Sequence, residues 1–308
     1  MQSLIEFFKE NKKININVDN DGVFSSLILK KLYDCDICGF NNNDKVIIHE
    51  KKIPFDELIY VDLHVGYPHI KSIDQHMVSV DMEHNHMLKN NPNKINPNID
   101  YDVVWSDYTN KFPFSTTIFL LIKAELDGKD LSWLDLNKQI TPNIRLGDLI
   151  WQTDSSYENH FKYNRNTTNW KNRLLELTNN GEFTTKLFRW LEEEIPSDLR
   201  ERDILSMQIG LWYKESFKCD NNHGGIRAGF ITEDGKISDN LLKYLITVGT
   251  FFDLNMGYME EKIFDTTVFK SKRFSYSDVK DRFDSTKLFS YGFIWGMNKD
   301  KNISATYQ

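Results

Sequence analysis

Cysteine is scarce in this chain, with 3 residues among 308. Cys35 and Cys38 form a lone C-x2-C pair, and Cys219 stands apart. A structural zinc site needs a second cysteine pair, or histidines at matching spacing, and neither accompanies this pair. We therefore expect two ordinary reduced thiols here, with a zinc site as the less favoured alternative.

Long apolar runs are also missing. No stretch approaches the roughly 20 consecutive apolar residues that a membrane-spanning helix needs. The first residues, MQSLIEFFKENKK, are amphipathic and contain acidic side chains, and they have neither a signal-peptide core nor a cleavage site. We expect a cytoplasmic protein with no membrane partner.

The chain has fewer basic than acidic residues. The 38 lysines and arginines are outnumbered by 45 aspartates and glutamates, so the net charge is −7 at pH 7. Whole-molecule charge therefore does not steer this protein to long nucleic acids. A local basic patch, or a bound metal ion, would still allow it to hold a small anionic substrate.

Hydrophobic residues make up 40% of the chain and aromatic residues 13%, which indicates a folded protein large enough for two domains. In the first half, short strand-like stretches alternate with helix-like ones. This alternation predicts an α/β fold with a parallel sheet that has helices on both faces. The expected helices are 2–11, 23–33 and 112–126, and the expected strands are 14–18, 45–50, 57–63 and 70–77.

The alternation of strand-like and helix-like stretches does not continue into the second half of the sequence. Residues 164–210 have a helical pattern, and strand-like stretches return from 226. We predict an N-terminal domain over 1–195, a helical linker over 196–223, and a smaller α/β domain over 224–308. The motifs described below imply that the first is a metal-binding catalytic domain and the last a substrate-binding domain.

Acidic side chains follow three of the expected strands. The first strand ends at Asp19-Asn20-Asp21-Gly22, the next ends at Asp62 with His64 nearby, and the third ends at Asp74-Gln75-His76. Any one of these is ordinarily a turn or helix-cap residue, but the same feature recurs three times within sixty residues. Ligands bind at the carboxyl ends of parallel strands, and oxygen ligands with an imidazole suit Mn2+ or Mg2+.

These motifs resemble those of the DHH phosphoesterases in order and spacing. "DNDGVFSS" (19–26) is similar to the family's first motif, D-x-D-G-x-x-S, and "IYVDLH" to its second. "IDQH" stands where the family has D-H-H, with Gln75 in place of the first histidine. "INPNIDYDVVWSDYTNKFPFSTTIFLL" resembles the Asn-Pro loop and helix that follow, and the likeness covers most of residues 14–180.

The resemblance implies one or two Mn2+ or Mg2+ ions and assigns a role to each matching residue. The implied metal ligands are Asp19, Asp21, Asp62, Gln75 and Asp154, with Asp148 as the rival to Asp154. Asp62 would bridge two ions, and His76 would contact the scissile phosphate, which makes these two the implied catalytic residues. In "QHMVSVDMEHNHM" (75–87), His84 and His86 are alternative metal ligands on what we expect to be a polar loop.

The C-terminal part is more faintly similar to the DHH-associated substrate domain. Its phosphate-holding S-L-R-S strand falls on "VFKSKR", which implies substrate contacts from Lys270, Ser271, Lys272 and Arg273. A solvated run of charges on an edge strand explains the same residues without a substrate. The family's G-G-G-H segment is absent.

The function expected from the resemblance is metal-dependent hydrolysis of a phosphodiester by activated water. The expected substrate is a short or single-stranded nucleic acid, or a linear or cyclic dinucleotide. One alternative is a catalytically weakened relative that binds nucleotide or a partner protein, which Gln75 and the lost glycine motif favour. Another is a pyrophosphatase or polyphosphatase. A homodimer is one option for its assembly.

Overall fold

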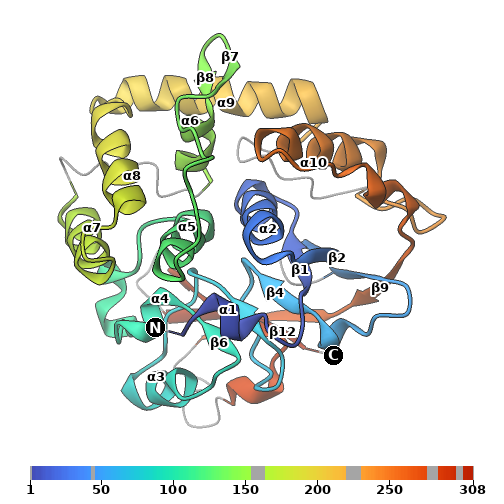
Figure 1. Cartoon of the computed structure of the whole chain (residues 1–308). Helices are drawn as coiled ribbons and strands as arrows, with labels where there is room; N and C mark the ends of the chain where they lie inside the picture. The colour runs from blue at the N-terminus through green and yellow to red at the C-terminus, as the bar shows by residue number, and fades with distance from the viewer. Residues whose placement is uncertain are drawn as a thin grey trace.

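A computed structural model describes residues 2–42, 46–153, 164–219, 230–275, 284–295 and 301–307. A seven-stranded sheet lies at its centre (Figure 1), in the order β6-β5-β4-β1-β2-β3-β9. Its parallel part consists of β1 (Lys13–Asn17), β2 (Asp36–Asn42), β4 (Ile59–Val61), β5 (Ser72–Ile73) and β6 (Lys94–Ile95). Two antiparallel strands, β3 (Val46–Glu50) and β9 (Phe264–Val268), extend one edge. The chain is therefore an α/β protein built on a mostly parallel sheet, as the sequence predicts.

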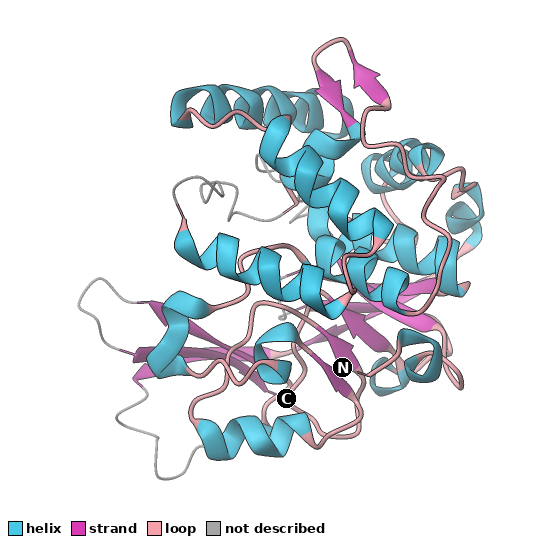
Figure 2. Ribbon diagram, turned by 60° about the vertical axis from the view of Figure 1, so that its left-hand side comes forward, coloured by secondary structure: helices cyan, strands magenta, loops and turns pink. Residues whose placement is uncertain are grey.

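The helices connect and cover these strands. In chain order they are α1 (Leu4–Phe7), α2 (Asn20–Tyr33), α3 (Met82–Lys89), α4 (Pro97–Asp100), α5 (Thr116–Leu126), α6 (Leu146–Trp151), α7 (Arg165–Leu177), α8 (Glu182–Glu193), α9 (Leu199–Phe217) and α10 (Asp239–Phe251). Figure 2 shows most of them on one side of the strands, with further helices on the other side.

Helices α2 and α5 pack against each other over the sheet, with α2 in contact with β1, β2 and β4. Most of α2 is buried because the sheet, α5 and α10 surround it, which is why its sequence carries apolar residues on several faces. Ser115 caps α5 by accepting a hydrogen bond from the Ile118 amide at 3.1 Å. These two helices fix the positions of the residues at the carboxyl edge of the sheet.

Aromatic residues from the C-terminal part fill a second apolar cluster together with Cys38 and Tyr60. The rings of Phe269 and Phe289 stack with their centroids 4.1 Å apart, and Phe289 meets the Tyr60 ring edge-on at 5.4 Å. Cys35, by contrast, belongs to the main core cluster. The two thiols of the C-x2-C pair thus lie in separate apolar clusters, as expected of structural cysteines and not of a zinc ligand pair.

A three-stranded antiparallel sheet, β10-β12-β11, is formed by strands near the end of the chain. Its strands are β10 (Lys270–Ser275), β11 (Ser290–Trp295) and β12 (Lys301–Tyr307), and a small hairpin elsewhere pairs β7 (Gln139–Thr141) with β8 (Ile144–Arg145). Helix α9 occupies most of the predicted linker. Strand β9 and helix α10, both from the predicted C-terminal domain, pack against β3 and α2.

The structure differs from the expected elements in several places, among them the strand expected at 70–77, which is limited to Ser72–Ile73. The helix expected at 2–11 is limited to Leu4–Phe7. The segment 75–87, expected to be a polar loop, contains the start of α3, because the Asp81 carboxylate caps that helix by accepting a hydrogen bond from the His84 amide at 2.9 Å. Strand β2 was missed, since "DICGFNN" has no clear alternation. In the described ranges, no helix is long and apolar enough to cross a membrane.

Candidate metal centre

Asp19, Asp62 and Asp74 follow the ends of β1, β4 and β5, which are neighbours in the sheet. The backbone ladder runs on past the strands: the Asp62 amide donates to the Ile73 carbonyl at 2.9 Å, and the Asp74 amide donates to the Ile95 carbonyl at 3.0 Å. All three carboxylates therefore emerge at one edge of the sheet, the edge where ligands bind in open α/β folds.

Gly22 explains how helix α2 can start so close to that edge. A Cβ at this position would lie 2.2 Å from the carbonyl oxygen of Asn17, the last residue of β1. Asp19 caps the helix by accepting a hydrogen bond from the Gly22 amide at 3.0 Å. The strand-to-helix turn therefore needs glycine at position 22, and it holds the Asp19 carboxylate in a fixed orientation.

Asn17 links two of the carboxylates. Its amide nitrogen Nδ2 lies 2.6 Å from Asp19 Oδ2 and 3.5 Å from Asp62 Oδ2. An uncharged amide thus contacts both oxygens without neutralising either charge.

Asp62 combines a strained backbone with a buried side chain. Its backbone has a φ of 62°, in the left-handed region that non-glycine residues seldom occupy, and its Oδ1 accepts a hydrogen bond from Thr116 Oγ1 at 2.9 Å. Burial raises the pKa of the Asp62 carboxyl well above its usual range, and so do the negative charges of Asp21, Asp19 and Asp74. A bound cation would relieve this unfavourable electrostatic energy.

Asp74 and His76 complete the cluster. The Asp74 carboxylate accepts hydrogen bonds from the amides of His76 (3.0 Å) and Met77 (2.8 Å), which orient it. The imidazole Nδ1 of His76 lies 3.3 Å from Asp74 Oδ1 and 3.5 Å from Asp62 Oδ1, and the ring is 51% exposed. Asp62, Asp74 and His76 each offer one ligand atom within 4.8 Å of the others, a spacing at which a single metal ion could be held.

Asp21, an expected ligand, has a different principal contact. Its Oδ2 accepts the Thr116 amide at 2.8 Å, and its Oδ1 accepts the Thr117 amide at 2.8 Å and the Thr117 hydroxyl at 2.7 Å. It therefore stabilises the N-terminus of α5, where a negative charge is favourable. Asp21 is not among the residues that line the adjoining cavity.

Gln75 is fully buried beside His76. Its Nε2 lies 3.0 Å from the imidazole Nδ1 of His76, and its backbone carbonyl accepts a hydrogen bond from Asn98 at 2.7 Å. Like Asp21, it does not line the cavity. Asp74 was expected at a strand end but was not among the expected ligands, and it forms the acidic group together with Asp62 and His76.

The carboxylates open into a cavity of about 370 Å³. Its walls come from both halves of the chain: Asn17, Asp19, Asn41, Asp62, Leu63, His64, Asp74, His76, Met77, Tyr108, Lys111, Ser290, Tyr291, Gly292 and Ser304. Lys111 contributes an ammonium group that lies 5.9 Å from the centre of the Tyr108 ring. No sequence motif predicts this role for Lys111, which is an isolated lysine in an irregular segment.

Two buried polar atoms at the cavity wall have no hydrogen-bond partner among the described residues. One is Oδ1 of Asn41, whose Nδ2 donates to Asn15 Oδ1 at 2.9 Å; the other is Nε2 of His64. Burial lowers the pKa of His64 well below its usual value, so its ring is neutral at pH 7. Unsatisfied polar atoms beside carboxylates are what a site for a cation and a polar ligand should contain, and the donor set fits Mn2+ or Mg2+.

The basic residues expected to hold substrate lie on β10. Lys270, Ser271, Lys272 and Arg273 are all exposed, and none lines the cavity. In the strand register Arg273 lies directly opposite Ser304 of β12, which does line it. Directly opposed residues share one face of an antiparallel pair, and Arg273 is the residue of this run whose direct partner on β12 lines the cavity.

Of the remaining expected ligands, the three that the structure describes do not join the cluster. Asp148 is buried at the start of α6 and pairs with Arg145, whose Nη2 lies 3.1 Å from Asp148 Oδ1. His84 accepts a hydrogen bond from the Val80 amide on Nδ1 at 3.1 Å, and its Nε2 lies 2.9 Å from the Tyr291 hydroxyl. His84 therefore connects α3 to β11. His86 is exposed, and Asp154 lies outside the described residues.

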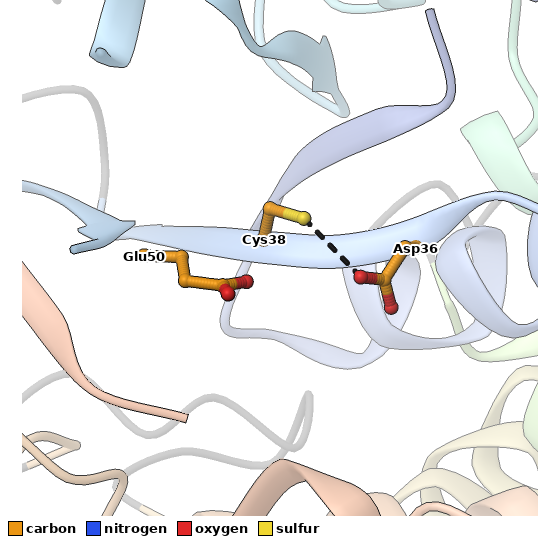
Figure 3. A group of neighbouring side chains, drawn as sticks. All are labelled: Asp36, Cys38 and Glu50. Atoms are coloured by element: carbon orange, nitrogen blue, oxygen red, sulfur yellow. Dashed lines mark hydrogen bonds between the residues drawn. The ribbon is translucent and has the colours of Figure 1, made fainter. Parts of the chain in front are cut away.

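A second acidic group, formed by Asp36, Cys38 and Glu50, lies on β2 and β3 (Figure 3). It already contains a cation, because Nζ of Lys262 lies 2.7 Å from Asp36 Oδ2 and 2.8 Å from Glu50 Oε2. The Cys38 thiol donates to Asp36 at 3.4 Å, and burial raises its pKa to about 12. This group is an internal ion-pair network and does not need a metal.

Comparison of the chain with protein-family models, with characterised proteins and with solved structures found no match. The likeness to the DHH phosphoesterases therefore stays a prediction from the sequence motifs. What the chain can do must be inferred from the geometry of the cavity and its carboxylates.

Proposed function

We propose that the chain is a metal-dependent phosphodiesterase that acts on short or single-stranded nucleic acid, or on a linear or cyclic dinucleotide. The observation that carries this proposal is the convergence of Asp19, Asp62, Asp74 and His76 on one cavity. Three carboxylates at one sheet edge are electrostatically unfavourable alone and favourable around Mn2+ or Mg2+. When bound, the metal would lower the pKa of a coordinated water and so supply a hydroxide nucleophile at neutral pH.

The chain's own residues would provide orientation and charge. Asp19, Asp62 and Asp74 would hold the cation, with their carboxylates oriented by the hydrogen bonds already described. His76, half-exposed at the cavity, would contact a phosphate oxygen. Lys111 on the wall, and Arg273, the strand partner of the cavity-lining Ser304, would add positive charge for further phosphates.

The size of the cavity favours a small substrate. About 370 Å³ is at the lower end of the range for small-molecule pockets and is suited to about one nucleotide. The net charge of −7 also opposes the binding of a long polyanion. We therefore expect activity on dinucleotides or short oligonucleotides in preference to long strands, in a cytoplasmic protein.

Binding without turnover is the second candidate. Gln75, buried against His76, offers no charge to a metal, and Asn17 places an amide between two carboxylates. A site with one weakly held ion would bind nucleotide but hydrolyse it slowly. A pyrophosphatase or polyphosphatase is the third candidate, because the same metal chemistry cleaves phosphoanhydrides.

The test is hydrolysis of a panel by the full chain with Mn2+ and with Mg2+. The panel contains a 5′-labelled dinucleotide, a short single-stranded DNA, cyclic dinucleotides and pyrophosphate. Asp62→Asn is the test variant, and Asp203→Asn, exposed on α9, is the matched control. We expect cleavage of a dinucleotide that is lost in Asp62→Asn and retained in Asp203→Asn. Metal-dependent binding without cleavage would support the second candidate, and cleavage of pyrophosphate alone the third.

A further inference from the structure

Two buried tyrosines far along the chain contact the residue between Asp19 and Asp21. The side-chain oxygen Oδ1 of Asn20 accepts a hydrogen bond from the Tyr244 hydroxyl at 3.0 Å and another from the Tyr213 hydroxyl. All three side chains are completely buried. Tyr213 comes from α9 and Tyr244 from α10, so both helices reach the turn that carries the proposed metal ligands.

The two tyrosines are themselves held firmly. Their rings meet edge-on with centroids 5.7 Å apart, and the Tyr244 ring stacks on Phe217 at 4.9 Å. Burial raises the pKa of both hydroxyls well above the ordinary value, so both remain protonated and can donate. The Nδ2 of Asn20 has no hydrogen-bond partner in the part of the chain that the structure describes. Within that part, the tyrosines are therefore what orients this side chain.

Three consecutive residues thus attach the turn to three different parts of the fold. Asp19 contacts Asn17 at the end of β1, Asn20 contacts α9 and α10, and Asp21 contacts the start of α5. Because Asn20 opens α2 directly after Asp19, a shift of its side chain would move the Asp19 carboxylate relative to Asp62. The hydroxyls of Tyr213 and Tyr244 are too far along the chain for any sequence motif to connect them with this turn.

We propose that Tyr213 and Tyr244 are positioning residues for the metal centre, which hold the Asp19–Asp21 turn in its ligating geometry through Asn20. This inference rests on the proposed function, because it concerns the ligands of the same site. It makes α9 and α10, outside the motif-bearing part of the chain, a part of the metal centre.

The experiment compares full-length Tyr213→Phe, Tyr244→Phe and the double variant with wild type. Tyr33→Phe is the matched control, because the buried Tyr33 hydroxyl also donates a hydrogen bond, to Asp127 at 2.9 Å. Tyr33 is the last residue of α2 and lies about 20 Å along the helix from Asn20. Mn2+ affinity is measured by calorimetry, and thermal stability is measured without metal. Amide hydrogen exchange of residues 18–24 gives a readout of the turn that does not depend on metal.

Each lost hydroxyl should weaken Mn2+ binding about fivefold, a factor that matches one ordinary hydrogen bond. Exchange over residues 18–24 should accelerate in both variants, whereas Tyr33→Phe should lose comparable stability without either effect. Unchanged Mn2+ affinity in both single variants would overturn the inference. If the wild type binds no Mn2+, the proposed function fails. Hydrogen exchange in the tyrosine variants then tests separately whether the tyrosines hold the turn. Unchanged protection of residues 18–24 refutes this positioning role, and lost protection supports it.

Discussion

Replacing Asp62 with asparagine should stabilise the metal-free protein and remove its response to metal. The substitution is nearly isosteric, and asparagine tolerates the left-handed backbone at this position, where φ is 62°. The asparagine Oδ1 can still accept the hydrogen bond that Thr116 Oγ1 now donates to Asp62 at 2.9 Å. The variant therefore removes one negative charge while leaving shape and backbone in place.

The expected gain follows from the charges around Asp62. Its side chain is 1% exposed and lies in the field of Asp19, Asp21 and Asp74. A like-charge pair about 5 Å apart costs about 3 kcal/mol at an effective dielectric constant of about 20. Hydrogen bonds and partial protonation offset part of this, so we expect a net stabilisation of about 1–3 kcal/mol. For a chain of this size that corresponds to a rise in melting temperature of several degrees.

The pH dependence provides a second check. Because the pKa of Asp62 is raised in the folded state, the folded protein takes up its proton at a higher pH than the unfolded chain. The stability that this proton provides is fully present below the unfolded pKa and is lost as pH rises through the folded pKa. The stability difference between Asp62→Asn and wild type should therefore be largest at neutral and alkaline pH and should shrink on acidification.

The assay is thermal and urea unfolding of metal-free protein between pH 4 and 8, repeated with Mn2+. Wild type should gain about 2.7 kcal/mol when Mn2+ is present at 100 times its dissociation constant, and Asp62→Asn should gain far less. Asp203→Asn should behave like wild type in every condition. An Asp62→Asn protein that is less stable than metal-free wild type at pH 8 would refute the claim that this carboxylate is held against electrostatic repulsion.

Two further substitutions test other contacts. Burial lowers the pKa of His84 to about 4, so the stability that its neutral ring contributes is complete above about pH 6.5 and is lost as pH falls towards 4. Urea unfolding of wild type should therefore show a loss of about 2–3 kcal/mol over this range. The same measurement on His84→Gln should not show this loss. In Lys262→Met, the free energy of unfolding should fall by about 1–3 kcal/mol, because Asp36 and Glu50 lose the ammonium group that they share. An unchanged free energy of unfolding in denaturant would mean that this ion-pair network contributes nothing to stability.

The carboxyl edge of the sheet could be predicted because each of its residues is local to a strand end. Asp19, Asp62 and Asp74 follow short apolar stretches, and the rule that parallel strands present ligands at that edge brings them together without knowledge of the tertiary structure. Gly22 could be recognised for the same reason, since it is needed where a strand turns directly into a helix. These features depend on neighbours within a few residues.

The residues that could not be predicted depend on distant partners. Whether Asp21 faces a metal or the start of α5 is decided by Thr116 and Thr117, 95 and 96 residues away. The cavity wall formed by Tyr291 and Ser304 needs the C-terminal strands to fold back over the first half of the chain. Strand β9 likewise joins the central sheet through β3, from more than 200 residues along the sequence. No short-range pattern encodes such pairings.

The two acidic groups found among the described residues differ in a way that favours a metal at one of them. Asp36 and Glu50 share an internal cation, Lys262, so their charges are balanced by the fold itself. For Asp62 and Asp74, the ionisable partner within the described ranges is His76, which faces solvent on one side. A buried carboxylate pair is costly to maintain unless something outside the chain compensates it. The difference between the two groups is therefore the physical reason to expect a cation at the sheet edge and none beside Cys38.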